Sequence, residues 1–145
     1  AVKVALTASP EKNTDQRERA YIANSNKGKL FISLHAASGF AQKPHAMGIY
    51  VPEIADVKTP TWKEAGKRHI AKSVMFAERL KAALDAAFPG NQYFLGKGPL
   101  ALFHGVAMPA VAVEAVDMSQ PPTPETIAKF AEAVYSALAE LDGRL

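Results

Sequence analysis

The sequence of 145 residues contains no cysteine. This excludes disulfide bonds, thiolate metal sites and a cysteine nucleophile, and it leaves the redox compartment open. No stretch approaches the roughly 20 consecutive apolar residues of a membrane-spanning helix, and no signal peptide pattern is seen. Lysine and arginine total 17, but they are scattered, so the net charge of +3 does not predict a nucleic acid partner.

The composition is that of an ordinary globular domain, with 48% apolar and 21% charged residues. At this length we expect a single domain covering residues 1–145. Strand-like stretches at 2–6, 30–35, 47–51 and 109–114 alternate with helix-like stretches at 15–24, 62–88 and 123–141. This alternation predicts an α/β fold in three layers, with a mostly parallel sheet and helices on both faces.

The stretch from Gln92 to Pro99 is predicted to be a loop, because it contains Gly96 and Gly98. Gly96-Lys97-Gly98 is the nearest approach to a phosphate cradle, but it lacks the spacing of a P-loop and the helix that should follow. We therefore do not expect a nucleotide site there.

Two apolar, strand-like runs each end in an ionisable residue, His35 and Glu114. Because the carboxyl ends of parallel strands share one edge of a sheet, we expect these two side chains to lie at a common edge. A neutral imidazole can bind zinc, and a glutamate beside it can accept a proton from water, so the pair predicts a site for metal-assisted hydrolysis. Simpler roles stay open: His35 as a strand-end residue hydrogen-bonded to a loop, and Glu114 paired with a nearby lysine or arginine.

The remaining histidines are weaker candidates. His45 stands in a proline-containing loop and is expected to be exposed, and His69 is expected on the surface of the long helix. His104 precedes Gly105 in a loop, from which it can approach the site. The sequence contains no HExxH motif.

Two blocks of sequence resemble the zinc-dependent N-acetylmuramoyl-L-alanine amidases, the family of cell-wall amidases found in division enzymes, sporulation lysins and phage endolysins. Residues 19–24 (RAYIAN) and 30–38 (LFISLHAAS) resemble the segment that carries the family's second metal histidine. Residues 100–114 (LALFHGVAMPAVAVE) resemble the block that ends in the catalytic glutamate. Gly48-Ile49-Tyr50 matches the strand between them.

The resemblance implies an α/β sheet with helices on both faces and cleavage of the amide between N-acetylmuramic acid and L-alanine. It implies that His35 is a zinc ligand and that Glu114 handles the proton of the attacking water. It also implies peptidoglycan as the partner and a periplasmic or extracellular location at the cell envelope.

Several positions depart from the family pattern. The family opens with a strand that ends in a glycine-flanked histidine, followed by a glutamate ligand on a helix, and nothing here matches that opening. Ala8 and Ala37 stand where arginine and asparagine are usual. Two of the three expected zinc ligands are therefore absent, so we expect either that the first strand and helix are missing from this chain or that the domain has lost the site.

Three hypotheses remain. The first is a zinc-dependent peptidoglycan amidase domain whose first ligands lie outside this chain. The second is a catalytically inactive, amidase-like module that binds peptidoglycan or a cell-envelope protein. The third is a scaffold fragment of a larger envelope protein.

Overall fold

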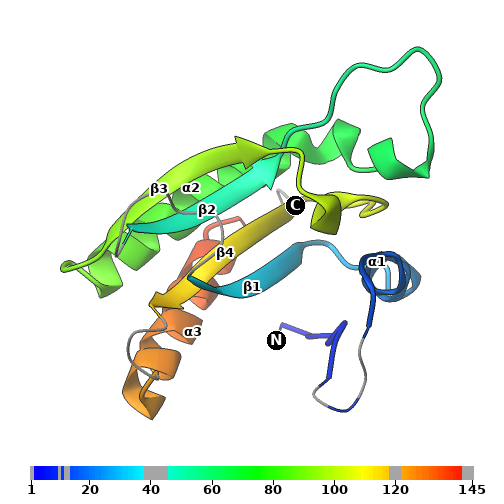
Figure 1. Cartoon of the computed structure of the whole chain (residues 1–145). Coiled ribbons are helices and arrows are strands. Elements are labelled where there is room, and N and C mark those ends of the chain that lie inside the picture. Colours follow the sequence, from blue (N-terminus) through cyan, green and yellow to red (C-terminus); the bar gives the residue numbers. More distant parts are fainter. Residues whose placement is uncertain (1, 10, 12–13, 38–45, 118–121, 142–145) are drawn as a thin grey trace.

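The computed structural model describes residues 2–9, 11, 14–37, 46–117 and 122–141. The helices are α1 (Gln16–Ser25), α2 (Ile70–Ala87) and α3 (Pro124–Ala139), and the strands are β1 (Phe31–Ala37), β2 (Ala46–Pro52), β3 (Gln92–Gly98) and β4 (Ala110–Asp117). Short 3-10 turns occupy η1 (Trp62–Glu64), η2 (Lys67–His69) and η3 (Ala101–Phe103). Figure 1 shows how these elements are arranged.

The strands form one sheet in the order β1-β4-β2-β3. β1 pairs with β4 and β2 pairs with β3 in parallel, whereas β2 runs antiparallel to β4. The predicted α/β class and mostly parallel sheet are therefore confirmed. The single antiparallel contact makes the sheet mixed, with β1 and β3 at its edges.

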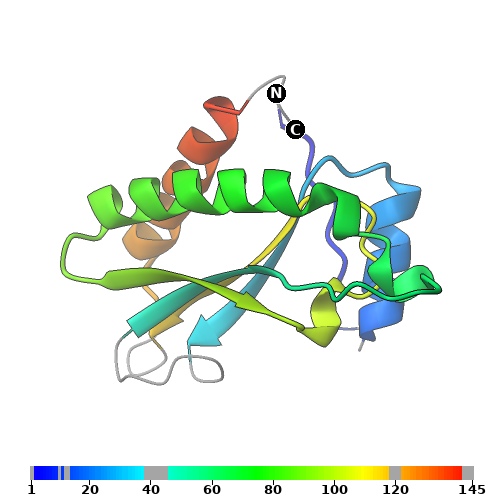
Figure 2. The same ribbon diagram turned by 90° about the horizontal axis from the view of Figure 1, so that it is seen from above.

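The two faces of the sheet carry different apolar clusters, because successive side chains of a strand point to opposite sides. α2 and α3 cover one face, where Phe76, Leu80 and Leu84 pack against strand residues such as Ile49 and Val113. Figure 2 shows both helices on the same side of the sheet.

The opposite face carries a second cluster. Ala20 and Ala23 of α1, together with η3, pack there against Phe31, Tyr50 and Ala112. Helices on both faces are therefore confirmed, but α1 reaches only the end of its face where β1 begins (Figures 1 and 2).

Two predicted segments differ from the elements that the structure shows. The segment expected as one long helix begins with η1 and η2, and α2 starts only at Ile70. Gly66 lies between the two turns, and a Cβ there would approach Val106 O to 2.8 Å. The stretch expected as a loop is β3, whose full length pairs in register with β2. Gly96 is required there by close packing against Tyr50 and not by a turn.

Residues 2–6 were predicted to form a strand, but they are extended and exposed outside the four-stranded sheet. The start of the last helix follows the expected rule: the Thr123 hydroxyl accepts a hydrogen bond from Thr126 N and Pro124 occupies the first turn.

Candidate functional site

His35 and Glu114 lie opposite one another on adjacent parallel strands. Their Cα atoms are register partners of β1 and β4, and the pairing becomes irregular immediately after them. Both residues lie on the face directed away from α2 and α3, because they share the alternation of Phe31 and Ala112, which belong to the second cluster. The structure thus brings together the two strand-end residues that the sequence singled out.

Glu114 is the most deeply buried ionisable residue of this face, with 1% of its surface exposed. Its Oε2 accepts a hydrogen bond from Gly48 N at 2.9 Å and from the Tyr50 hydroxyl at 3.4 Å. A buried carboxylate needs such donors to offset the loss of water. Both of these donors come from β2, the strand antiparallel to β4.

Tyr50 is buried and its ring is closely held. The ring meets Phe94 edge-on, with centroids 5.6 Å apart. Burial raises the pKa of the Tyr50 phenol to about 12, and the charge of Glu114 and its hydrogen bond contribute to the same shift. Tyr50 therefore stays protonated over the neutral pH range and presents a hydrogen-bond donor to the carboxylate.

His35 is half-buried beside these groups. Its Nε2 lies 3.0 Å from the hydroxyl of Ser33, two residues earlier on the same face of β1. Ser33 is itself buried. The serine hydroxyl therefore helps to orient the imidazole ring.

The two other histidines that the structure describes do not join this pair. His69 caps the start of α2, where burial and the neighbouring cations lower its pKa. His104 stacks edge-on against Trp62, with ring centroids 6.5 Å apart, so the expectation that it approaches the site was wrong. His45 lies outside the described residues.

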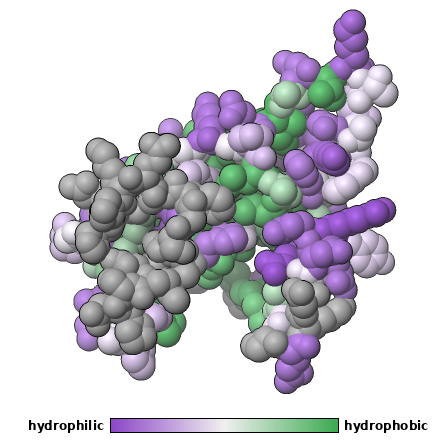
Figure 3. Space-filling view, viewed as in Figure 1, coloured by the Kyte–Doolittle hydropathy of each residue, from purple (hydrophilic) through white to green (hydrophobic). Residues whose placement is uncertain are grey.

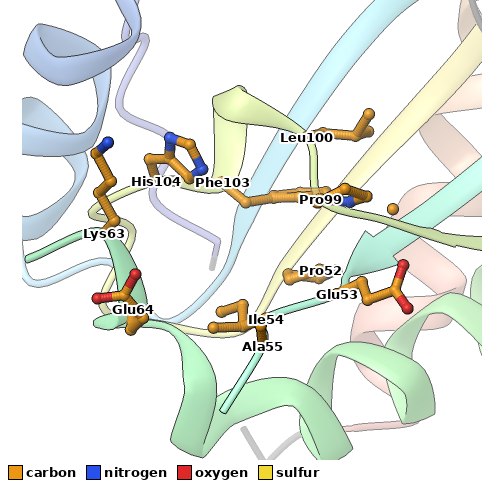
Figure 4. Close-up of a pocket in the computed structure, with 11 residues that line it drawn as sticks. Pro52, Glu53, Ile54, Ala55, Lys63, Glu64, Pro99, Leu100, Phe103 and His104 are labelled. Carbon is orange, nitrogen blue, oxygen red and sulfur yellow. The ribbon is translucent and has the colours of Figure 1, made fainter. Parts of the chain in front are cut away.

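A pocket of about 190 Å³ lies at the carboxyl ends of β2 and β3. Its walls combine apolar Ile54, Leu100 and Phe103 with Lys63 and His104 on one side and Glu53 on another, as Figure 4 shows. Because β2 runs antiparallel to β4, this pocket is at the opposite end of the sheet from the carboxyl end of β4.

Zinc in catalytic sites needs about three protein ligands and an open position. Within the part of the chain that the structure describes, no three His, Asp or Glu side chains gather closely enough to hold a metal ion. His35 fits the chemistry of one ligand and Glu114 that of a proton acceptor, so the described residues form only part of such a site.

Figure 3 shows the same side of the molecule as Figure 1, with hydrophobic residues near the middle and hydrophilic residues around them. Among the described helices, none is both long and apolar enough to cross a membrane.

The sequence interpretation missed the part played by Tyr50 and Gly48. Both were assigned only to a strand, although their spacing of two residues already places them on one face. That they meet Glu114 depends on β2 pairing with β4, for which the sequence carries no local signal.

The family model for N-acetylmuramoyl-L-alanine amidase matches residues 1–140 of this chain. No curated protein matches it closely enough to be compared.

Solved structures of amidases share the fold. The catalytic domain of CwlV from Bacillus (Paenibacillus) polymyxa var. colistinus superposes with a TM-score of 0.68 at 20% identity, over 97% of this chain and 73% of that one. Ami1 from Mycobacterium abscessus gives 0.61 at 21% identity, over 92% and 65%. CwlD from Clostridioides difficile, solved in complex with the GerS lipoprotein, gives 0.61 at 14% identity, over 96% and 71%.

Proposed function

We propose, since this chain belongs to the N-acetylmuramoyl-L-alanine amidase family, that it hydrolyses the amide between N-acetylmuramic acid and the L-alanine of the peptidoglycan stem peptide. One observation carries the proposal: His35 and Glu114 lie opposite one another, and Glu114 is held by two donors from β2. We place this activity at the cell envelope, where the substrate is found.

Glu114 is the proposed general base and acid. A carboxylate in this position accepts a proton from the attacking water and delivers it to the departing amine, so that the amide nitrogen leaves as a neutral group. Burial excludes bulk water from the carboxylate, and the Gly48 N–H keeps Oε2 in one place during the transfer.

His35 is the proposed zinc ligand of this chain. Zinc, when bound, supplies a Lewis acid that polarises the amide carbonyl and activates water. The described residues supply only part of such a zinc site.

A second candidate function is a module that binds peptidoglycan, or an envelope protein, without cleaving it. The departures of the sequence from the family's metal-ligand pattern favour this alternative. The net charge of +3 would attract anionic polymers of the cell wall. The related CwlD was solved in complex with a lipoprotein, so a protein partner at the envelope is a further possibility to test.

Zinc content and amide hydrolysis separate the two functions. The purified chain would be analysed for zinc by mass spectrometry and assayed for release of stem peptide from peptidoglycan. Glu114→Gln should abolish release without unfolding the protein, because the amide keeps the shape of the carboxylate but cannot accept the proton. Glu78→Gln, an exposed change on α2, is the matched control.

Stoichiometric zinc with activity that only Glu114→Gln removes would support the amidase. Absence of zinc and of peptide release, with retained sedimentation of the chain with peptidoglycan sacculi, would support the binding module. Release that persists in Glu114→Gln would contradict the proposed role of Glu114.

A further inference from the structure

Tyr50 delivers a hydroxyl group to Glu114 from the neighbouring strand. Its oxygen lies 3.4 Å from Oε2, the same atom that accepts the Gly48 N–H at 2.9 Å. Hydrogen bonds to an ionised carboxylate are stronger than those between neutral groups. Two donors from β2 thus converge on one oxygen of a buried carboxylate and restrict how its plane can turn.

The tyrosine ring sits in a slot left by two glycines. A Cβ on Gly48 would lie 2.3 Å from Tyr50 Cε2 and 2.6 Å from its hydroxyl oxygen, and a Cβ on Gly96 would lie 2.8 Å from Cδ1. Gly48 is two residues before Tyr50 on β2, and Gly96 is its register partner on β3. The ring can take this place only because both positions lack a side chain.

The edge of Phe94 limits the ring from another side. The position of the hydroxyl is therefore set by packing and not by the hydrogen bond alone. A donor that is fixed by packing keeps its acceptor in one orientation, whereas a donor on a flexible side chain would move with the acceptor.

We infer that Tyr50 is a positioning residue, which orients the carboxylate of Glu114 for proton transfer. The inference rests on the proposed function, in which Glu114 moves the proton. Tyr50 itself remains a hydrogen-bond donor. Burial and the neighbouring charge of Glu114 raise its pKa to about 12, so the phenol keeps its proton at neutral pH.

Tyr50→Phe is the direct test, because it removes the hydroxyl and keeps the ring in its slot. We expect kcat for stem-peptide release to fall about three- to tenfold, with KM changed less than about twofold, since the loss concerns the reacting step and not substrate binding. The melting temperature should change little. Tyr93→Phe removes the hydroxyl of a buried tyrosine that packs in the cluster against α2, and it should leave kcat unchanged.

A double-mutant cycle in urea unfolding measures the contact independently of activity. The effects of Tyr50→Phe and Glu114→Gln on stability should be non-additive, whereas those of Tyr93→Phe and Glu114→Gln should add. This second measurement also shows whether the Tyr50 and Glu114 side chains interact, if the Tyr50→Phe variant proves too unstable for kinetic assays.

The outcomes distinguish the two proposals. If the wild-type chain releases no stem peptide, the proposed function fails, and an additive cycle would then overturn the contact as well. If the wild type is active and Glu114→Gln is inactive, but Tyr50→Phe retains the wild-type kcat, the positioning role is overturned and the proposed function stands. A lowered kcat at constant KM together with a non-additive cycle supports the inference.

Discussion

Gly48 on β2 donates its backbone N–H to the side-chain Oε2 of Glu114 on β4, at 2.9 Å. The antiparallel register of these strands includes Ile49↔Val113 and Tyr50↔Ala112. Gly48 precedes Ile49 on β2 and Glu114 follows Val113 on β4, so this hydrogen bond lies one residue beyond the paired positions. A backbone group of the sheet itself therefore helps to hold the acidic group of the candidate site.

Replacing Gly48 by alanine should disturb this arrangement. The new Cβ would overlap the Tyr50 ring, which is itself enclosed by Gly96 and Phe94 and has little room to move. We expect the free energy of unfolding to fall by about 1–3 kcal/mol, as for other overpacked sites. The displaced ring should also lower kcat for stem-peptide release at least as much as Tyr50→Phe does.

The control is Gly90→Ala, where an added Cβ meets nothing within 4 Å. Its urea unfolding curve should lie within about 0.5 kcal/mol of wild type. Equal effects of the two alanines would contradict the close packing described for Tyr50.

The Tyr50 phenol should titrate unusually late. Ultraviolet absorbance of phenolate, taken as the difference between wild type and Tyr50→Phe, should show a pKa of about 12. Glu114→Gln removes the charge that disfavours phenolate, so the pKa should move down toward 10.0 but remain above it, because burial is the largest cause of the shift. An unchanged pKa in Glu114→Gln would show that the two side chains do not interact.

The same shift predicts a loss of stability in alkali. A tyrosine whose folded pKa exceeds its unfolded value stabilises the fold fully below the unfolded pKa of 10.0, and this contribution disappears as the pH rises through about 12. Between these limits the wild type should lose more stability than Tyr50→Phe. Chemical unfolding of both proteins at pH 8 and pH 11 would measure the difference.

Ser73 connects the start of α2 to the start of β4. It is 1% exposed, and its hydroxyl donates to His69 O at 3.1 Å and accepts from Ala110 N at 2.9 Å. Ser73→Ala would leave the buried Ala110 N–H without this acceptor and should cost about 1–3 kcal/mol in urea unfolding. Ser136→Ala, at an exposed position of α3, should have almost no effect.

Asn24 ties α1 to the segment that precedes β4. Its Nδ2 donates to Gly105 O at 2.8 Å, and its Oδ1 accepts from Ala107 N at 3.0 Å. Asn24→Ala removes both bonds and should lower stability by about 1–3 kcal/mol. Ser25→Ala, the next residue and also exposed, serves as the control. Equal stability of the two variants would show that water replaces the asparagine without loss.

Much of the architecture can be predicted from local sequence patterns. Apolar runs ending at His35 and Glu114, and the capping residues Thr123 and Pro124, indicate their strands and helix directly, because each pattern depends on neighbours in the chain. β3 escaped prediction because its glycines suggest a turn. Gly96 instead makes room for the Tyr50 ring of the adjacent strand, which no local window contains.

The sequence by itself determined that two strands carry a histidine and a glutamate near their carboxyl ends, and that parallel pairing would bring them to one edge. Only the tertiary structure decided that β2 lies between β4 and β3, antiparallel to β4 and parallel to β3, and so which groups meet the glutamate. The reason is physical: alternation along a strand sets the face on which a side chain lies, whereas its partners on that face follow from how distant strands bury their shared core.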